Sequence, residues 1–295
     1  MLFGVINKTF IYCVLFIFLG LLTVNCQSNE KYVQDTVEQC QEFIDQDEII
    51  KANKCYAKAI IFRPSTVDEL SEIRNDKFSD RCFDLKNQKK QYAHAIECFK
   101  VMSVLNPADF IIHRNLSASY LRYYIRIPND NNSINQAENH IIKAIEIAPQ
   151  DAISYDIYGR ILEQKGDFTG AFEKYKIATT LAPKDFIFWL STALLQRRLG
   201  NHKDSIKSYT KVLELKPKET LALYDIGTAY ERTRDIDNAI TYLEKLQKID
   251  SKFEDVEERL KALKEAKKTG VLHSFKENMK PPSRPRLKLA PVPYN

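Results

Sequence analysis

The sequence contains few glycines, 8 among 295 residues, whereas an average chain has about 7%. None lies between residues 21 and 158, and no two stand in G-x-G, G-x-S-x-G or G-x-x-x-x-G-K spacing. Dinucleotide fingerprints, phosphate loops and nucleophile elbows need these spacings, because glycine alone permits the tight turns and the close approach to a ligand. The scarcity therefore excludes the usual glycine-built enzyme sites.

Clusters of catalytic or metal-ligating side chains are also scarce. The five histidines include no H-E-x-x-H motif and no pair at i,i+4 spacing. An alternative metal site could be drawn from Cys82, His94 and Cys98, but their spacing matches no common zinc signature and a fourth ligand is missing. No motif in the sequence indicates a catalytic nucleophile paired with a general base. We therefore predict a protein that is not an enzyme, with no metal, no cofactor and no small-molecule substrate.

Outside the segment 271–295, the chain carries nearly equal numbers of basic and acidic residues. The formal net charge is +5, from 44 basic and 39 acidic residues, and the segment 271–295 alone holds five basic residues and one acidic residue. A body near neutrality argues against nucleic acid as a partner, because such binding neutralises many phosphates. The segment 281–295 also holds 5 of the 11 prolines. We predict that residues 270–295 form a basic, proline-rich, disordered tail.

The amino terminus has the pattern of a targeting segment. After Lys8 comes the apolar run 10–24, whose 15 residues are fewer than the ~20 that span a bilayer. The junction Leu22-Thr-Val-Asn-Cys26 resembles the lipobox of bacterial lipoproteins, which implies a signal peptide over 1–25, lipidation of Cys26 and a polar tether over 26–32. Conventional cleavage near this point and an uncleaved anchor are the alternatives. An exported protein held in the cell envelope, on the outer-membrane or periplasmic side, is expected.

Four further cysteines stand at positions 40, 55, 82 and 98. An exported chain permits disulfides, and four cysteines allow three pairings. One disulfide in each helical hairpin would fit the repeat register described next. Small buried free thiols are the alternative, and the sequence does not decide between them.

A repeat period of 34 residues runs through the chain. It is marked by prolines and by small residues that recur at this spacing: Pro149, Pro183, Pro217, Ala137, Ala171, Ser205 and Ala239. A period of this length is typical of stacked helical hairpins. The proline ends a helix because it lacks an N–H and clashes with the preceding turn. The small residues let two helices approach closely.

The repeat resembles that of the tetratricopeptide repeat (TPR) family. The match is fullest in 152–185, where the family's aromatic, small and Gly-Asp positions are occupied by Tyr155, Tyr158, Gly159, Gly166, Asp167, Ala171, Tyr175, Ala178 and Pro183. The resemblance implies an all-α, right-handed α-solenoid of helix-turn-helix hairpins, with a capping helix over 254–269. Six repeats span 33–253, namely 33–66, 67–109, 110–151, 152–185, 186–219 and 220–253. Segment 110–151 is eight residues longer than the period, and we expect the insertion in the turn-rich stretch 128–133.

The resemblance also implies a function in binding proteins through a concave groove lined by the first helix of each hairpin. The family's peptide clamp for a terminal carboxylate is not reproduced. The groove positions give instead a mixed basic and apolar set: Arg114, Arg122, Arg160, Leu190, Leu194, Arg197, Arg198, Tyr224 and Arg232. Such a surface suits a peptide with acidic groups and apolar anchors. We therefore predict a lipid-anchored interaction scaffold with a protein or peptide partner; an uncleaved membrane-anchored repeat protein that assists envelope assembly or secretion is the alternative.

Overall fold

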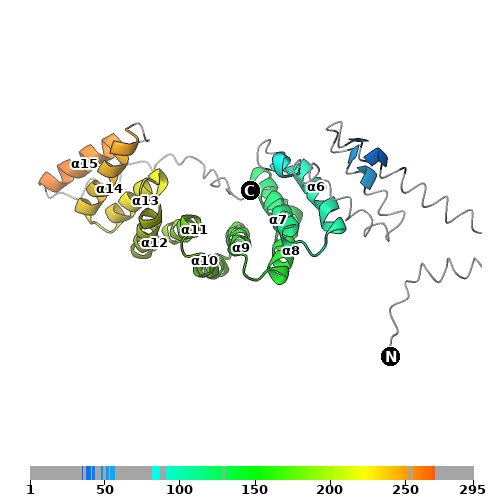
Figure 1. Ribbon diagram of the computed structural model, residues 1–295. Coiled ribbons are helices and arrows are strands. Elements are labelled where there is room, and N and C mark those ends of the chain that lie inside the picture. The colour runs from blue at the N-terminus through cyan, green and yellow to red at the C-terminus, as the bar shows by residue number, and fades with distance from the viewer. Residues whose placement is uncertain are drawn as a thin grey trace, which may run out of the picture. The chain divides into compact units, whose positions relative to one another are not determined.

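The structure is a computed structural model (Figure 1). It describes residues 35, 38–40, 42–43, 48, 51–52, 54–56, 82–86, 91–128, 130–251, 253 and 255–269. The predicted signal peptide, Cys26, the tether and the tail lie outside these residues. The chain divides into two compact units, 1–140 and 141–295, with the boundary inside one helix.

Unit 1 contains short helical segments followed by longer helices. Residues 38–40, 54–56 and 82–86 are helical, and α6 (Tyr92–Leu105) packs against α7 (Phe110–Arg126). The unit ends within α8 (Asn131–Ile147). Two disulfides join Cys40 to Cys55 and Cys82 to Cys98, with Cα–Cα separations of 5.3 and 5.6 Å.

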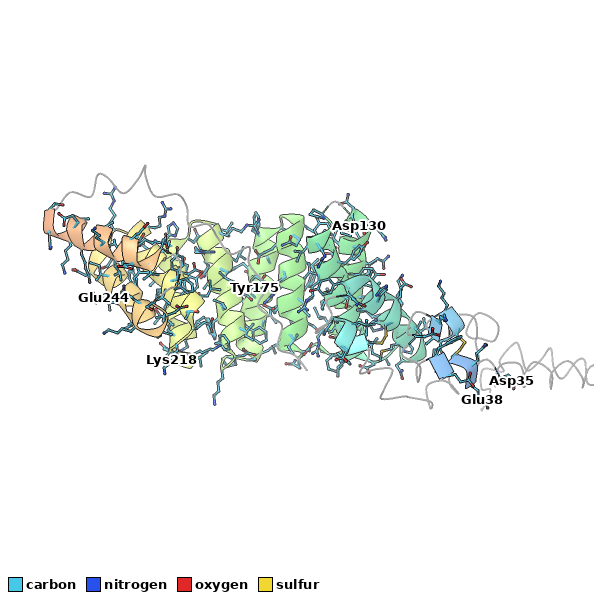
Figure 2. All side chains as sticks on the ribbon, turned by 90° about the horizontal axis from the view of Figure 1, so that it is seen from above. Asp35, Glu38, Asp130, Tyr175, Lys218 and Glu244 are labelled. Carbon is cyan, nitrogen blue, oxygen red and sulfur yellow. A yellow bond between two sulfur atoms is a disulfide. The ribbon has the colours of Figure 1, made fainter. Side chains whose placement is uncertain are left out.

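Beyond the end of α8, the described residues of unit 2 form three helical hairpins and a final helix (Figure 1). The hairpins are α9 (Ala152–Lys165) with α10 (Phe168–Leu181), α11 (Phe186–Arg198) with α12 (His202–Leu215), and α13 (Thr220–Arg232) with α14 (Ile236–Ile249). The last helix, α15 (Val256–Thr269), packs on α14. Figure 2 labels Glu244 of α14, whose carboxylate lies 2.6 Å from the ammonium of Lys264 on α15.

Aspartate side chains fix where several helices begin. The carboxylates of Asp151, Asp167, Asp185 and Asp235 accept hydrogen bonds from backbone N–H groups in the first turns of α9, α10, α11 and α14. These bonds satisfy N–H groups that have no partner inside the helix. At the other end, Gly166 ends α9 with φ = 84°, a left-handed conformation in which a side chain would be strained.

Close packing explains the small residues of the period. A Cβ on Gly159 would lie 2.5 Å from a ring carbon of Tyr175, and one on Gly227 would lie 2.9 Å from Leu243. Tyr175, labelled in Figure 2, is fully buried between α9 and α10. The two helices of these hairpins are therefore close because the first carries no side chain at the crossing point.

The longer repeat 110–151 departs from the expectation drawn from the sequence. Helices α7 and α8 have 17 residues each, whereas α9 and α10 have 14 each. The eight extra residues therefore lengthen both helices, by three residues each, and only the remaining two fall in the connection 127–130. The turn-forming residues Asn131, Asn132 and Ser133 belong to the first turn of α8, where the Asp130 carboxylate accepts from the Ser133 N–H at 3.3 Å. In the residues that the structure describes every regular element is a helix, which confirms the all-α prediction.

Candidate functional site

Two of the arginines predicted to line the groove form ion pairs with buried carboxylates of unit 2. The Arg160 guanidinium lies 2.8 Å from the Asp156 carboxylate and donates to the Ser191 hydroxyl of the next hairpin at 3.2 Å. The Arg197 guanidinium donates to Asp225 on α13 at 2.6 Å. Asp156 and Asp225 are both buried. These arginines therefore neutralise buried carboxylates and link successive repeats.

Leu190 and Tyr224 were predicted to face a ligand, but both are buried. Leu190 packs with Ala222 and Ile226 of α13, and Tyr224 packs with Val256 and Leu260 of α15. Leu190 is thus covered by α13, the first helix of the next hairpin, and Tyr224 is covered by the final helix α15. Leu194 is only partly buried in the same cluster as Leu190. The prediction that Leu190 and Tyr224 are ligand contacts is therefore corrected to a structural role.

Arg198 and Arg232 remain at the surface of unit 2. The Arg198 side chain is 50% exposed and lies 3.3 Å from Glu163, with its guanidinium 4.9 Å from the centre of the Phe168 ring. Arg232 ends α13 and is exposed. Of the groove arginines of unit 2, these two present most surface to a partner.

Unit 1 brings together the two remaining arginines with two residues that the sequence did not single out. Lys86 donates to the Asn115 side-chain oxygen, and both Arg114 and Arg122 of α7 lie near enough to lower the pKa of Lys86. We call Lys86, Arg114, Asn115 and Arg122 the basic cluster. The segment 67–109 is nine residues longer than the 34-residue period, which obscures the repeat register around Lys86, so the sequence did not single it out. Asn115 directly follows Arg114, and this adjacency was the signal that could have indicated it.

Burial and aromatic rings set the electrostatics of the basic cluster. Burial lowers the pKa of Lys86 to about 7, and the positive charges of Arg122 and Arg114 contribute to that decrease. The cation of Lys86 lies 5.3 Å from the centre of the Phe83 ring, and that of Arg122 lies 5.9 Å from the Tyr92 ring. Such contacts hold cations against an aromatic face. The cluster combines positive charge with low solvation, which strengthens attraction to an anion.

The alternative metal site is contradicted by the cysteine geometry. Cys82 and Cys98 are joined in a disulfide, so neither supplies the thiolate that a metal requires. His94 instead lies 3.0 Å from the Gln91 side-chain oxygen. Among the described residues, no three His, Cys, Asp or Glu side chains are grouped so that they could hold a metal ion.

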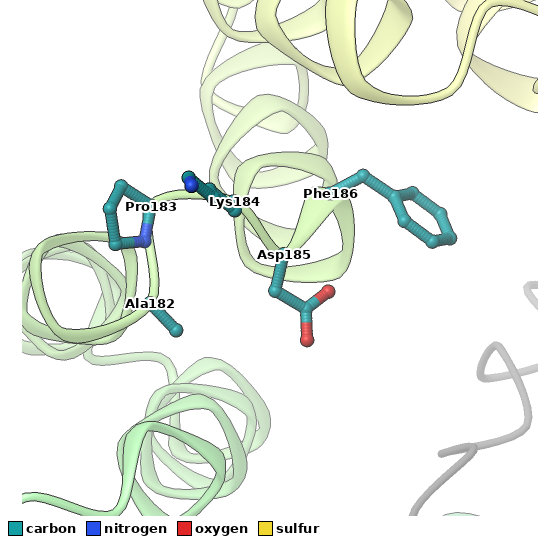
Figure 3. A pocket seen from close by; sticks show the side chains of 5 residues that line it. All are labelled: Ala182, Pro183, Lys184, Asp185 and Phe186. Atoms are coloured by element: carbon teal, nitrogen blue, oxygen red, sulfur yellow. The ribbon is translucent and has the colours of Figure 1, made fainter.

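A shallow pocket of about 680 Å³ lies at the connection between α10 and α11 (Figure 3). It is lined by Ala182, Pro183, Lys184, Asp185 and Phe186. The Asp185 carboxylate accepts from the Ile187 N–H at 2.9 Å, and the Pro183 carbonyl accepts from the Trp189 indole at 2.9 Å. The Asp185 carboxylate and the Pro183 carbonyl are therefore occupied by hydrogen bonds within α11 and its preceding turn. The residues that line the pocket do not form a set of catalytic side chains.

Comparisons with known proteins support the repeat assignment. Residues 190–252 match the family model described as "Tetratricopeptide repeat". The chain is 25% identical over 224 residues to BBSome complex member BBS4 of Bos taurus, covering 71% of this chain and 41% of that protein. It is 22% identical over 199 residues to Tetratricopeptide repeat protein 6 of Homo sapiens, covering 56% of this chain and 37% of that protein. The chain thus spans less than half the length of these curated relatives.

Solved structures show the same fold. The MamA protein superposes with a TM-score of 0.50 at 22% identity, covering 62% of this chain and 93% of MamA. The pilF protein of Pseudomonas aeruginosa superposes with a TM-score of 0.51 at 12% identity, covering 80% of this chain and 99% of that chain. The prediction of a TPR-type α-solenoid is therefore confirmed. Within the part of the chain that the structure describes, we find no helix with the length and apolarity needed to cross a membrane.

Proposed function

We propose that the protein is a non-catalytic scaffold that binds a protein partner through an acidic segment, and that the basic cluster of unit 1 is the main docking point. TPR hairpins support the general role, and one curated relative is named as a member of a complex. The observation that carries the proposal is the convergence of Lys86, Arg114 and Arg122 beside a buried amide. A carboxylate that binds there gains charge-assisted hydrogen bonds in a poorly solvated setting.

In unit 2, taken by itself, the proposal assigns partner contacts to Arg198 and Arg232, which keep exposed positive charge. Arg160 and Arg197 are assigned to stability instead, because their buried carboxylate partners need them. The predicted preference for acidic groups therefore rests on fewer arginines than the sequence pattern indicates.

The docking point is tested by charge reversal in the full chain. Arg122→Glu should reduce the affinity for a fluorescein-labelled hexaglutamate peptide at least tenfold, measured by fluorescence anisotropy. Lys207→Glu is the matched control, since it makes the same change in net charge at a side chain that is 79% exposed on α12. Equal affinity of the two variants, with circular dichroism showing both folded, would refute the docking point. A partner captured from envelope extract should bind wild type and the Lys207 variant, and not the Arg122 variant.

We further propose that the scaffold is exported and held in the cell envelope by a lipid on Cys26. The apolar run 10–24 and the lipobox-like junction before Cys26 support this proposal. Labelled palmitate should be incorporated into the wild-type protein and not into Cys26→Ala. If the wild-type protein incorporates none and stays in the membrane fraction, the uncleaved membrane-anchored protein assisting envelope assembly or secretion takes the place of the lipoprotein.

A further inference from the structure

Three stretches of the chain have the sequence Asn-x-Ser or Asn-x-Thr, and they begin at Asn7, Asn115 and Asn131. In an exported protein such a stretch is an acceptor for an N-linked glycan, which needs a place on the surface. Asn7 belongs to the predicted signal peptide, outside the described residues. The structure distinguishes between the other two.

Asn115 is buried within unit 1. It is 4% exposed, its Nδ2 donates to the Ile111 carbonyl at 2.7 Å, and its Oδ1 accepts from Lys86. Ser117, the third residue of this stretch, is fully buried, and its hydroxyl donates to the Ala137 carbonyl at 2.6 Å. A saccharide on Asn115 would push apart the side chains packed against α7, so a chain modified there does not reach this fold.

Asn131 has the opposite setting. It is the first residue of α8 and is exposed, as is Asn132 beside it. The first turn of the helix is fixed by the Ser133 hydroxyl, which donates to the carboxylate of Asp130 at 2.6 Å (Figure 2). A saccharide on Asn131 would extend into solvent and leave this hydrogen bond intact.

The hairpin of α7 and α8 has a longer tip than that of α9 and α10. The helices α7 and α8 meet where the Ser117 hydroxyl contacts the Ala137 carbonyl. Nine residues of α7 (118–126) follow Ser117, whereas six residues of α9 (160–165) follow the equivalent Gly159. The start of α8 is longer by the same three residues, so the tip extends about 4.5 Å further along the hairpin. The acceptor asparagine at the start of α8 is therefore carried away from the packed part of the hairpin.

The same tip exposes apolar side chains. Ile125 is 37% exposed and Ile127 is 47% exposed, and Pro128 is exposed as well. Ile127 and Asn131 are four positions apart, so their Cα atoms are separated by at most about 14 Å. A bulky, polar saccharide on Asn131 would lie beside this apolar surface and make the tip more soluble.

From these observations we propose that Asn131 carries an N-linked glycan. The inference rests on the proposed export of the chain, and it does not require the lipid on Cys26. The disulfides Cys40–Cys55 and Cys82–Cys98 fit the same route, because disulfides form in the oxidising compartments that exported chains enter.

The modification is a group transfer from a polyprenyl diphosphate-linked saccharide, catalysed by an oligosaccharyltransferase of the export membrane. A bond forms between the Asn131 Nδ2 and C1 of the saccharide, and the bond from that C1 to the diphosphate oxygen breaks. The polyprenyl diphosphate leaves, and the amide gives up one of its two protons. Because Ser133 is 3% exposed in the folded helix and its hydroxyl belongs to the acceptor motif, the transfer takes place before α8 forms.

The test uses the full chain, with its amino terminus intact, in the cells that naturally make it. Peptide-N-glycosidase in H₂¹⁸O releases an N-linked glycan and leaves ¹⁸O-labelled aspartate, which peptide mass spectrometry locates. We expect the label at position 131 and a single downward shift on a gel, and Asn131→Gln should lose both. Asn132→Gln is the matched control, because it changes the neighbouring exposed amide and keeps an Asn-x-Ser stretch. Ser133→Thr should keep the glycan, whereas Ser133→Ala should lose it.

The state of the cysteines, measured by alkylation of free thiols before reduction, reports on export independently. An unmodified Asn131 in wild type with both disulfides formed overturns the inference and leaves the export standing. An unmodified Asn131 with free thiols at all four cysteines overturns both. A glycan found on Asn115 of the folded protein, or a gel shift that survives in Asn131→Gln, also overturns the inference.

Discussion

The adjacent residues Arg197 and Arg198 should differ sharply in their contribution to stability. Asp225 is 1% exposed and is held by the Arg197 guanidinium at 2.6 Å and the Tyr209 hydroxyl at 2.9 Å. Removing one partner of a buried ion pair costs about 3–5 kcal/mol, because a charge is left buried without compensation. Since Tyr209 still donates and Arg197 is 17% exposed, we expect Arg197→Met to lower the free energy of unfolding by about 3 kcal/mol.

Arg198→Met is the matched comparison. The Arg198 side chain is 50% exposed and lies 3.3 Å from Glu163, and an exposed pair of this kind contributes about 0–1 kcal/mol. For a unit of this size the two losses correspond to decreases in Tm of roughly 6–12 °C and roughly 0–4 °C. Methionine keeps most of the apolar stem of each arginine, so the comparison isolates the charged group.

Thermal and urea unfolding, followed by circular dichroism, provide the assay. Fluorescence of Trp189, the single tryptophan of the chain, adds a local probe because it lies on the same helix as Arg197. The double variant Arg197→Met with Asp225→Asn removes both charges and should recover at least about 1 kcal/mol of the loss. If the single Arg197 variant is no less stable than the Arg198 variant, or if the double variant is the least stable, the assignment of Arg197 to a buried ion pair is wrong.

Three further predictions concern packing, the disulfide and pH. Gly159→Ala should destabilise unit 2 by about 2 kcal/mol, since the added Cβ would lie 2.5 Å from a ring carbon of the buried Tyr175; chemical denaturation measures this. Replacing Cys82 and Cys98 by serine should cost about 3 kcal/mol for a loop of this length and should raise the pKa of Lys86 from about 7 toward 10.5, as lysine side-chain NMR would record. Because the unfolded chain binds more protons than the folded one at Lys86, the stability of unit 1 should rise between pH 7 and 9, measured by hydrogen exchange in α7.

Each of these predictions has an internal control. Gly200→Ala has no atom within 4 Å of the added Cβ but requires φ = 78°, so only the strain of about 1 kcal/mol is expected there. Replacing Cys40 and Cys55 by serine should leave the pKa of Lys86 unchanged, because that disulfide does not hold the segment 82–86. Lys86→Met should lose the increase in stability with pH. A larger loss at Gly200 than at Gly159, or a pH dependence that survives in Lys86→Met, would contradict the respective argument.

The helical hairpins of unit 2 could be predicted because each depends on local signals. The aspartates at the helix starts, Gly166 after α9 and the prolines after the second helices act within one turn of the chain. Such signals predict where a helix begins and ends whatever packs against that helix. The longer helices of the repeat 110–151 could not be placed in this way. Asparagine and serine favour turns as well as first helical turns, so the stretch 128–133 pointed to an extended loop.

The candidate site was predictable only in part. The repeat register placed Arg114 and Arg122 on one helix, eight residues apart, which corresponds to about 12 Å along its axis. The repeat register did not predict that Lys86 lies near these two arginines, because Lys86 is on a separate segment and contacts α7 through Asn115. The choice of one disulfide per hairpin over other pairings or free thiols likewise depends on which helices approach each other.

By itself the sequence determined the period, the all-α class and the scarcity of enzyme motifs, because these follow from residue types at fixed spacing along one chain. Only the tertiary structure decided which arginines are available to a partner. Arg197 and Arg198 are neighbours in sequence, yet one meets the buried Asp225 of the next repeat and the other stays half exposed. The physical reason is that successive residues of a helix point in different directions. Whether an arginine is buried in an ion pair or stays exposed therefore depends on which residue of the neighbouring helix lies opposite it.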